Sequence, residues 1–180
     1  MVTARWRAED GLGIEHADVA VGASEIRVES VVTGDRFGPY GARYRLHCTG
    51  DWTVRSVEID VVGGASLRLA SDGEGNWRDG AGSPLPELQG CIDVDISATP
   101  LTNTLPIRRL RLAEGARREI RVVYIAVPSL TLAPALQAYT CLMSDRRYRY
   151  EGLFRHFETE LDVDGHGLVT DYPTLFRRVL

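Results

Sequence analysis

Hydrophobic and polar residues alternate with a period of two along most of the chain. The alternation is clear at residues 24–31, 42–48, 53–61, 118–125 and 157–163. Such alternation over four to eight residues is typical of a β-strand with one buried and one solvent-facing side. Further runs of this kind bring the expected total to about ten to fourteen strands.

Short turn sequences rich in glycine and aspartate separate the alternating runs, for example at 34–35, 63–64, 71–76 and 164–167. Short connections favour antiparallel neighbours. The pattern therefore predicts an all-β fold, a single large antiparallel meander sheet curled on itself as a half-barrel or open barrel. No linker or repeat divides the chain, so we expect one β domain over residues 1–180.

Helix is expected only as a few short turns. Residues 101–105 are predicted to form a turn that Pro106 ends, and residues 134–137 and 174–178 are predicted to form two more. Residues 107–112 are predicted as a strand, with Leu110 and Leu112 on one face.

Composition excludes several function classes. The 180 residues are 44% hydrophobic, and 21 basic against 25 acidic residues give a net charge of −4, so nucleic acid is not expected as a partner. Every basic residue is arginine, which excludes lysine Schiff-base chemistry. Cys48, Cys91 and Cys141 are widely spaced and are expected to be buried free thiols. We expect no cofactor and no metal site.

The N-terminal residues lack the apolar run of a secretory signal, and no stretch approaches the length of a membrane span. We therefore expect a cytoplasmic protein. The acidic glycine-rich segments at 72–80 and 162–167 are interpreted as hairpin turns, since a calcium loop would need a further ligand where His166 stands and a glutamate where Pro173 stands. The segment 146–150 alternates Arg and Tyr, which on a strand places Tyr148 and Tyr150 on the buried face.

Residues 90–109 form the most unusual segment. Asp93 and Asp95 share one face of a predicted strand, and Arg109 follows on what is expected to be a later strand. These charges are predicted either to form a paired network or to face solvent. The polar run 99–104 lies between two prolines, which favours a shaped loop that is either structural or ligand-lining.

The same segment carries a family resemblance. Trp77, residues 82–96 and residues 99–109 resemble the central signature of the bacterial putative glycolipid-binding family, and residues 139–142 and 161–173 fit its later part. The resemblance covers nearly the whole chain. It implies a large antiparallel sheet curled on itself, broadly like periplasmic lipoprotein carriers, and carries no established catalytic residues.

The leading functional hypothesis is non-covalent binding of an amphiphilic small molecule, such as a lipid or glycolipid, in the concavity of the sheet. We select candidate ligand-binding residues by the strand face on which they lie and by their place in the family signature. They are Trp77, as an aromatic wall, and Asp95, Asn103, Arg109, Tyr139, Tyr150 and Tyr172.

Two alternatives remain open. One is an acid–base enzyme in the same cavity, with Asp93 or Asp95 as the base and Arg109 as the electrostatic stabiliser. A desolvated carboxyl group inside the pocket would favour this alternative. The other is a protein-interaction module, which would need a long unpaired sheet edge. The ligand, the strand order and the oligomeric state do not follow from the sequence.

Overall fold

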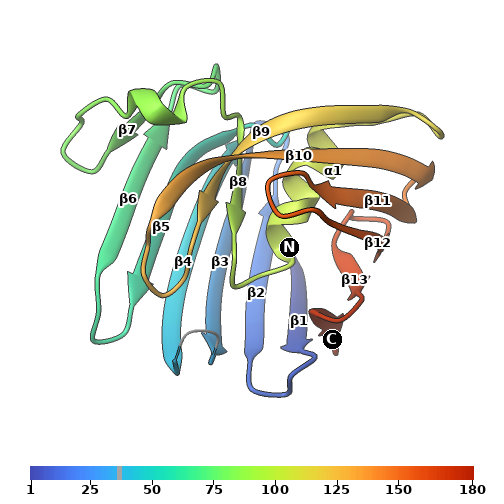
Figure 1. Ribbon diagram of the computed structural model, residues 1–180, viewed down its shortest axis with the longest axis horizontal. Helices are drawn as coiled ribbons and strands as arrows, with labels where there is room; N and C mark the ends of the chain where they lie inside the picture. Colours follow the sequence, from blue (N-terminus) through green and yellow to red (C-terminus); the bar gives the residue numbers. More distant parts are fainter. Residues whose placement is uncertain (36–37) are drawn as a thin grey trace.

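The computed structural model describes residues 1–35 and 38–180, which form fourteen strands in a single sheet. The sheet has the order β7-β6-β5-β4-β3-β2-β1-β14-β13-β12-β11-β10-β9-β8. It curls without closing into a barrel, because β7 and β8 end the order and do not pair with each other (Figure 1). The predicted all-β class and the large curled sheet are confirmed.

The first half of the sheet comprises β1 (Val2–Ala8), β2 (Ile14–Val21), β3 (Glu25–Gly34), β4 (Tyr40–Thr49), β5 (Val54–Val61), β6 (Ser66–Ser71) and β7 (Trp77–Asp79). The second half comprises β8 (Asp93–Ile96), β9 (Arg117–Ile125), β10 (Leu132–Met143), β11 (Arg147–Gly152), β12 (Phe157–Val163), β13 (Val169–Tyr172) and β14 (Phe176–Arg178). Two 3₁₀ turns, η1 (Pro86–Leu88) and η2 (Leu101–Asn103), and one helix, α1 (Thr104–Leu110), lie between β7 and β9.

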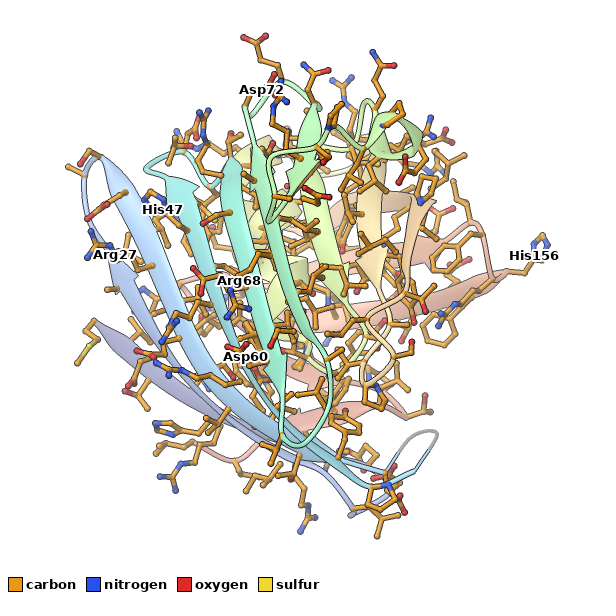
Figure 2. All side chains as sticks on the ribbon, turned by 90° about the vertical axis from the view of Figure 1, so that its left-hand side faces the viewer. Arg27, His47, Asp60, Arg68, Asp72 and His156 are labelled. Carbon is orange, nitrogen blue, oxygen red and sulfur yellow. The ribbon has the colours of Figure 1, made fainter. Side chains whose placement is uncertain are left out.

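The alternating sequence separates a dry inner face from a charged outer face. Along β3, Ile26, Val28, Ser30 and Val32 are buried, while Arg27, Glu29 and Val31 between them are exposed. Figure 2 shows Arg27, His47, Asp60 and Arg68 on the outer side of β3 to β6. Cross-strand ion pairs such as Arg68 Nη2 to Asp60 Oδ1 at 2.8 Å cover this face, and the inner face forms the core.

The two halves meet where the ends of the chain pair. β14 pairs antiparallel with β1, opposing Trp6 to Arg178 and Ala8 to Phe176. Trp6 also donates its indole N–H to the carbonyl of Val169 at 2.6 Å, across the same junction.

Not every pair is antiparallel. β8 pairs with β9 in parallel, with Asp93 opposite Val122 and Ile96 opposite Ile125. The twenty residues that connect these strands contain η2 and α1, and a crossover of this length returns the chain in the same direction.

The structure differs from the sequence prediction at one expected strand and two expected helical turns. Residues 107–112 are not a strand, since α1 runs through Pro106 to Leu110. Pro106 is the third residue of α1, where its missing N–H has no intrahelical acceptor, so it is tolerated rather than ending the turn. Residues 134–137 belong to strand β10, and β14 takes the place of the expected C-terminal turn. In both places strand pairing outweighs the local signal from proline.

The segment 91–110 fills the inside of the curled sheet (Figure 1). Val94, Ile96, Leu101 and Leu105 pack in one core cluster with residues of β1 to β7. Ile107 belongs to a second cluster formed with β9 to β13. This segment therefore packs into the concavity and contributes to both core clusters.

Candidate functional site

A cavity of about 290 Å³ lies between the segment that carries β8 and the strands β9, β11, β12, β13 and β14. Its wall combines aromatic side chains with a few polar groups, a composition common in ligand sites. The lining residues are Asp95, Ile96, Ser97, Thr99, Asn103, Tyr124, Tyr150, Gly152, Phe154, Arg155, Phe157, Tyr172, Leu175 and Phe176. We call this cavity the aromatic pocket.

Four rings from four strands form one wall of the aromatic pocket. The Tyr172 ring lies 6.1 Å from Tyr150, 6.3 Å from Phe157 and 6.2 Å from Phe176, measured between centroids. The Tyr150 and Phe157 rings are 6.3 Å apart. Strand alternation brings these rings to the inner face, where tilted and edge-on contacts hold them in place.

Asp95 is the acidic group of the aromatic pocket. Its Oδ2 accepts a hydrogen bond of 2.6 Å from Nε2 of Gln137, which is buried in β10. Burial raises the pKa of Asp95 to about 6, against the opposing effects of this hydrogen bond and the nearby charge of Arg155. Asp95 therefore exchanges a proton close to neutral pH.

Arg155 lies at the rim of the aromatic pocket. Its guanidinium carbon is 4.4 Å from the centroid of the Tyr124 ring and 4.8 Å from that of Phe154, within cation–π range. Its side chain is exposed, and its charge acts on the carboxyl group of Asp95. Arg155 therefore presents an exposed positive charge at the rim of the aromatic pocket.

Asn103 and Tyr139 form a support behind the ring wall. The Tyr139 hydroxyl donates to Oδ1 of Asn103 at 2.8 Å, and Nδ2 of Asn103 donates to the carbonyl of Pro100 at 3.0 Å. Tyr139 is 2% exposed and lies 5.4 Å from the Tyr150 ring. Asn103 lines the aromatic pocket. Tyr139 lies behind it, where it holds the Asn103 amide and contacts the Tyr150 ring of the wall.

The remaining two predicted residues lie elsewhere. Trp77 is buried in β7 at the end of the sheet, where its indole N–H donates to the carbonyl of Cys91 at 2.7 Å. Arg109 is on α1 and makes a two-pronged ion pair with the fully buried Asp93 at 3.0 and 2.5 Å. Of the two arrangements expected for the charges of this segment, Asp93 adopts the paired one. Neither Trp77 nor Arg109 lines the aromatic pocket.

Sequence reasoning missed Tyr124, Phe154, Arg155, Phe157 and Phe176. Phe157 begins an alternating run, so the alternation could have predicted that its ring points inward. Phe154 and Arg155 lie in the turn between β11 and β12, for which periodicity gives no orientation.

The described residues contain no cluster of three or more His, Cys, Asp or Glu side chains that could hold a metal ion. Cys48, Cys91 and Cys141 are free and buried, as predicted. In the part of the chain that the structure covers, no helix has the length and apolar character needed to cross a membrane.

Comparison with known proteins gives two matches. The structure resembles a crystal structure of a DUF1089 family protein from Pseudomonas aeruginosa with a TM-score of 0.80 and 40% sequence identity, over 92% of each chain. A search of the curated proteins finds no match. The sequence matches the family described as "Putative glycolipid-binding" over residues 3–178, and the chain therefore belongs to this family.

Proposed function

We propose that the protein binds an amphiphilic small molecule, such as a glycolipid, in the aromatic pocket. The observation that carries this proposal is a wall of four rings facing a few convergent polar groups in a space of about 290 Å³. The rings offer contact to an apolar chain, and Asp95, Asn103 and Arg155 offer hydrogen bonds and charge to a polar head. The family description points in the same direction.

The size of the aromatic pocket limits the ligand. Its volume lies at the lower end of the roughly 300–1,000 Å³ found for small-molecule sites. Because residues 91–110 already occupy the inside of the sheet, the proposal is for one short apolar chain and its head rather than a lipid with several chains.

The test is calorimetric titration with n-octyl β-D-glucoside below its micelle concentration. Phe157→Ala removes a ring from the wall and is expected to weaken binding about tenfold or more. Leu136→Ala is the matched control, because Leu136 is 52% exposed on β10 and lies outside the aromatic pocket. Native mass spectrometry of protein from its own host is expected to show an amphiphile bound in equal amount.

The proposal fails if the protein arrives empty and also binds no amphiphile from a host lipid extract. It fails equally if Phe157→Ala and Leu136→Ala bind the glucoside as tightly as the parent protein.

Acid–base catalysis on a small molecule is a second candidate, and one observation supports it. Asp95 is a desolvated carboxyl group with a pKa of about 6 inside the aromatic pocket, a value suited to proton transfer near neutral pH. The test is a metabolite screen for turnover, in which Asp95→Asn should abolish any activity found. Turnover that Asp95→Asn leaves unchanged would exclude Asp95 as the base.

The third hypothesis, an interaction module, gains little support from the edges. The two end strands, β7 and β8, are three and four residues long, which leaves little edge for strand addition.

A further inference from the structure

Two opposite charges line the aromatic pocket, and they lie at different depths. Asp95 and Arg155 are the charged side chains of its described lining. Asp95 belongs to β8 on the inside of the sheet and is partly exposed, so a ligand in the aromatic pocket can reach its carboxyl group. Arg155 lies in the turn between β11 and β12 and is exposed at the rim. A ligand that enters therefore meets the cation first and the anion further in.

Tyr124 of β9 connects the two charges. It stands opposite Asp95 in the parallel pair of β8 and β9, and the guanidinium carbon of Arg155 lies 4.4 Å from the centroid of its ring. Arg155 acts on Asp95 through its charge, whereas Arg109 holds Asp93 directly by two hydrogen bonds. Since Asp95 and Arg155 also face one cavity, they differ from the closed pair of Asp93 and Arg109 in leaving room for a group between them.

The carboxyl group of Asp95 is under-compensated where it stands. Burial raises its pKa to about 6, and neither the hydrogen bond from Gln137 nor the charge of Arg155 offsets this effect. A carboxylate that has lost much of its hydration gains most from a cation brought close to it. The inner part of the aromatic pocket therefore favours a positively charged group.

The rings around Asp95 suit a cation of the ammonium kind. Tyr150, Phe157 and Tyr172 lie 6.1–6.3 Å from one another, measured between ring centroids, and the charge of Asp95 acts on Tyr150. The face of an aromatic ring carries partial negative charge and attracts an ammonium group. Arg155 shows the same attraction at the rim, where its guanidinium packs on two further rings.

A ligand with a single charge satisfies only one of the two groups. An anion at Arg155 brings a like charge towards Asp95, and a cation at Asp95 brings a like charge towards Arg155. An uncharged head leaves both groups without a counter-charge. A head that carries an ammonium group in front and an anionic group behind it meets each charge with its opposite.

We propose that the aromatic pocket takes a zwitterionic head, with its ammonium group at Asp95 among the rings and its anionic group at Arg155 on the rim. This inference rests on the proposed function and deepens it, because it assigns the charges of the ligand head. The apolar chain continues from the anionic group along the rings near the rim, which include the exposed ring of Phe154.

The test compares four probes that share one octyl chain, by calorimetric titration below their micelle concentrations. They are n-octylphosphocholine, n-octyl phosphate, n-octyltrimethylammonium and n-octyl β-D-glucoside. The zwitterion is expected to bind the parent protein about fivefold or more tightly than each of the others, because it meets both charges. Glycerophosphocholine, which has the same head without the octyl chain, is expected to bind about tenfold or more weakly than n-octylphosphocholine.

Two variants separate the two contacts. Asp95→Asn keeps the shape of the side chain without its charge, and should weaken n-octylphosphocholine about fivefold while n-octyl phosphate binds no more weakly. Arg155→Gln should weaken n-octylphosphocholine by about the same factor while n-octyltrimethylammonium binds no more weakly. Asp60→Asn and Arg68→Gln, on the charged outer side of the sheet (Figure 2), are the matched controls and should change no affinity.

A second measurement follows Asp95 in the unaltered protein. The ¹³C signal of its carboxyl carbon, assigned by its absence in Asp95→Asn, is titrated with and without n-octylphosphocholine. A nearby ammonium group favours the ionised carboxylate, so the bound zwitterion should lower the pKa of Asp95 from about 6 by about half a pH unit or more. The other ionisable groups that face Asp95 among the described residues are Arg155, Tyr124, Tyr139, Tyr150 and Tyr172.

The outcomes separate the two proposals. Binding of n-octyl β-D-glucoside as tight as that of n-octylphosphocholine would overturn the zwitterionic head and leave the aromatic pocket standing. Equal weakening of all four probes by Asp95→Asn or by Arg155→Gln would show general damage and overturn that contact. Binding of glycerophosphocholine as tight as that of n-octylphosphocholine would support the charge assignment and overturn the apolar chain. Absence of binding by every probe would overturn both proposals.

Discussion

At the scale of single residues, three carboxyl groups inside the curled sheet differ in their partners. Asp93 is fully buried and is held by the guanidinium of Arg109. Asp95 has an amide partner and faces the aromatic pocket. Glu15 has two hydroxyl partners on one oxygen and none among the described residues on the other. The first group is a structural ion pair, the second lines the aromatic pocket, and the third is buried with hydroxyl partners.

The Asp93–Arg109 pair leads to a stability prediction. Arg109→Ala leaves a buried carboxylate without a counter-charge and should lower the free energy of unfolding by about 3 kcal/mol. Urea unfolding measures the loss. Arg147→Ala, which breaks the exposed pair with Asp162, is the control and should cost far less. Equal losses for the two variants would contradict the structural role of the buried pair.

Glu15 makes stability depend on pH. Its pKa is raised from 4.5 to about 7, so the folded state binds more protons than the unfolded state between these values. The stabilising effect of the proton is full below about pH 4.5 and is lost as the pH rises to about 7. Relative to Glu15→Gln, the free energy of unfolding should fall by about 3 kcal/mol over this window. Urea unfolding from pH 4 to 8 measures it, and parallel curves would contradict the prediction.

At the scale of elements, α1 is a short helix with a strained end. Arg111 caps its C-terminus with φ 47° and ψ 49°, a left-handed conformation that favours glycine. A helix of seven residues has little stability of its own, so packing of Leu105 and Ile107 in the two core clusters holds it in place.

This strain predicts a stabilising substitution. Arg111→Gly should raise the free energy of unfolding by about 0.5–1 kcal/mol, since glycine adopts positive φ without a steric penalty. Arg118→Gly is the matched control, because the exposed Arg118 lies in β9 and glycine weakens a strand. Thermal or urea unfolding distinguishes the two, and destabilisation by Arg111→Gly would contradict the prediction.

At the scale of the whole molecule, β14 joins two half-sheets into one cooperative unit. It is three residues long and pairs with β1 on one side and β13 on the other. Trp6, Trp52 and Trp77 all lie in the first half, whereas most tyrosines, including Tyr139, Tyr148, Tyr150 and Tyr172, lie in the second. The two halves therefore carry separate spectroscopic probes.

Removal of residues 174–180 should uncouple the halves. In the full chain, tryptophan fluorescence and the near-ultraviolet signal of tyrosine should follow one urea transition. In the truncated chain, the two transitions should separate, because β14 no longer bridges β1 and β13 and two strand edges become unpaired. Coincident transitions in the truncated chain would show that the core alone couples the halves.

Much of the fold follows from the sequence because strand alternation is a local property. Alternation and turn residues determine the strands, the inward tyrosines of β11 and the charged outer face. Four predicted residues, Asp95, Asn103, Tyr150 and Tyr172, line the aromatic pocket, and Tyr139 supports it from behind.

Only the tertiary structure decided where the chain folds back into its own concavity. The sequence at 107–112 predicts a strand, whereas packing between the two half-sheets selects α1. The same packing pairs Asp93 with Arg109 and leaves the aromatic pocket beside the segment. Glu15 is buried beside Tyr44 and Thr99, which lie 29 and 84 positions further along the chain. Contacts between such distant residues depend on topology rather than on local pattern.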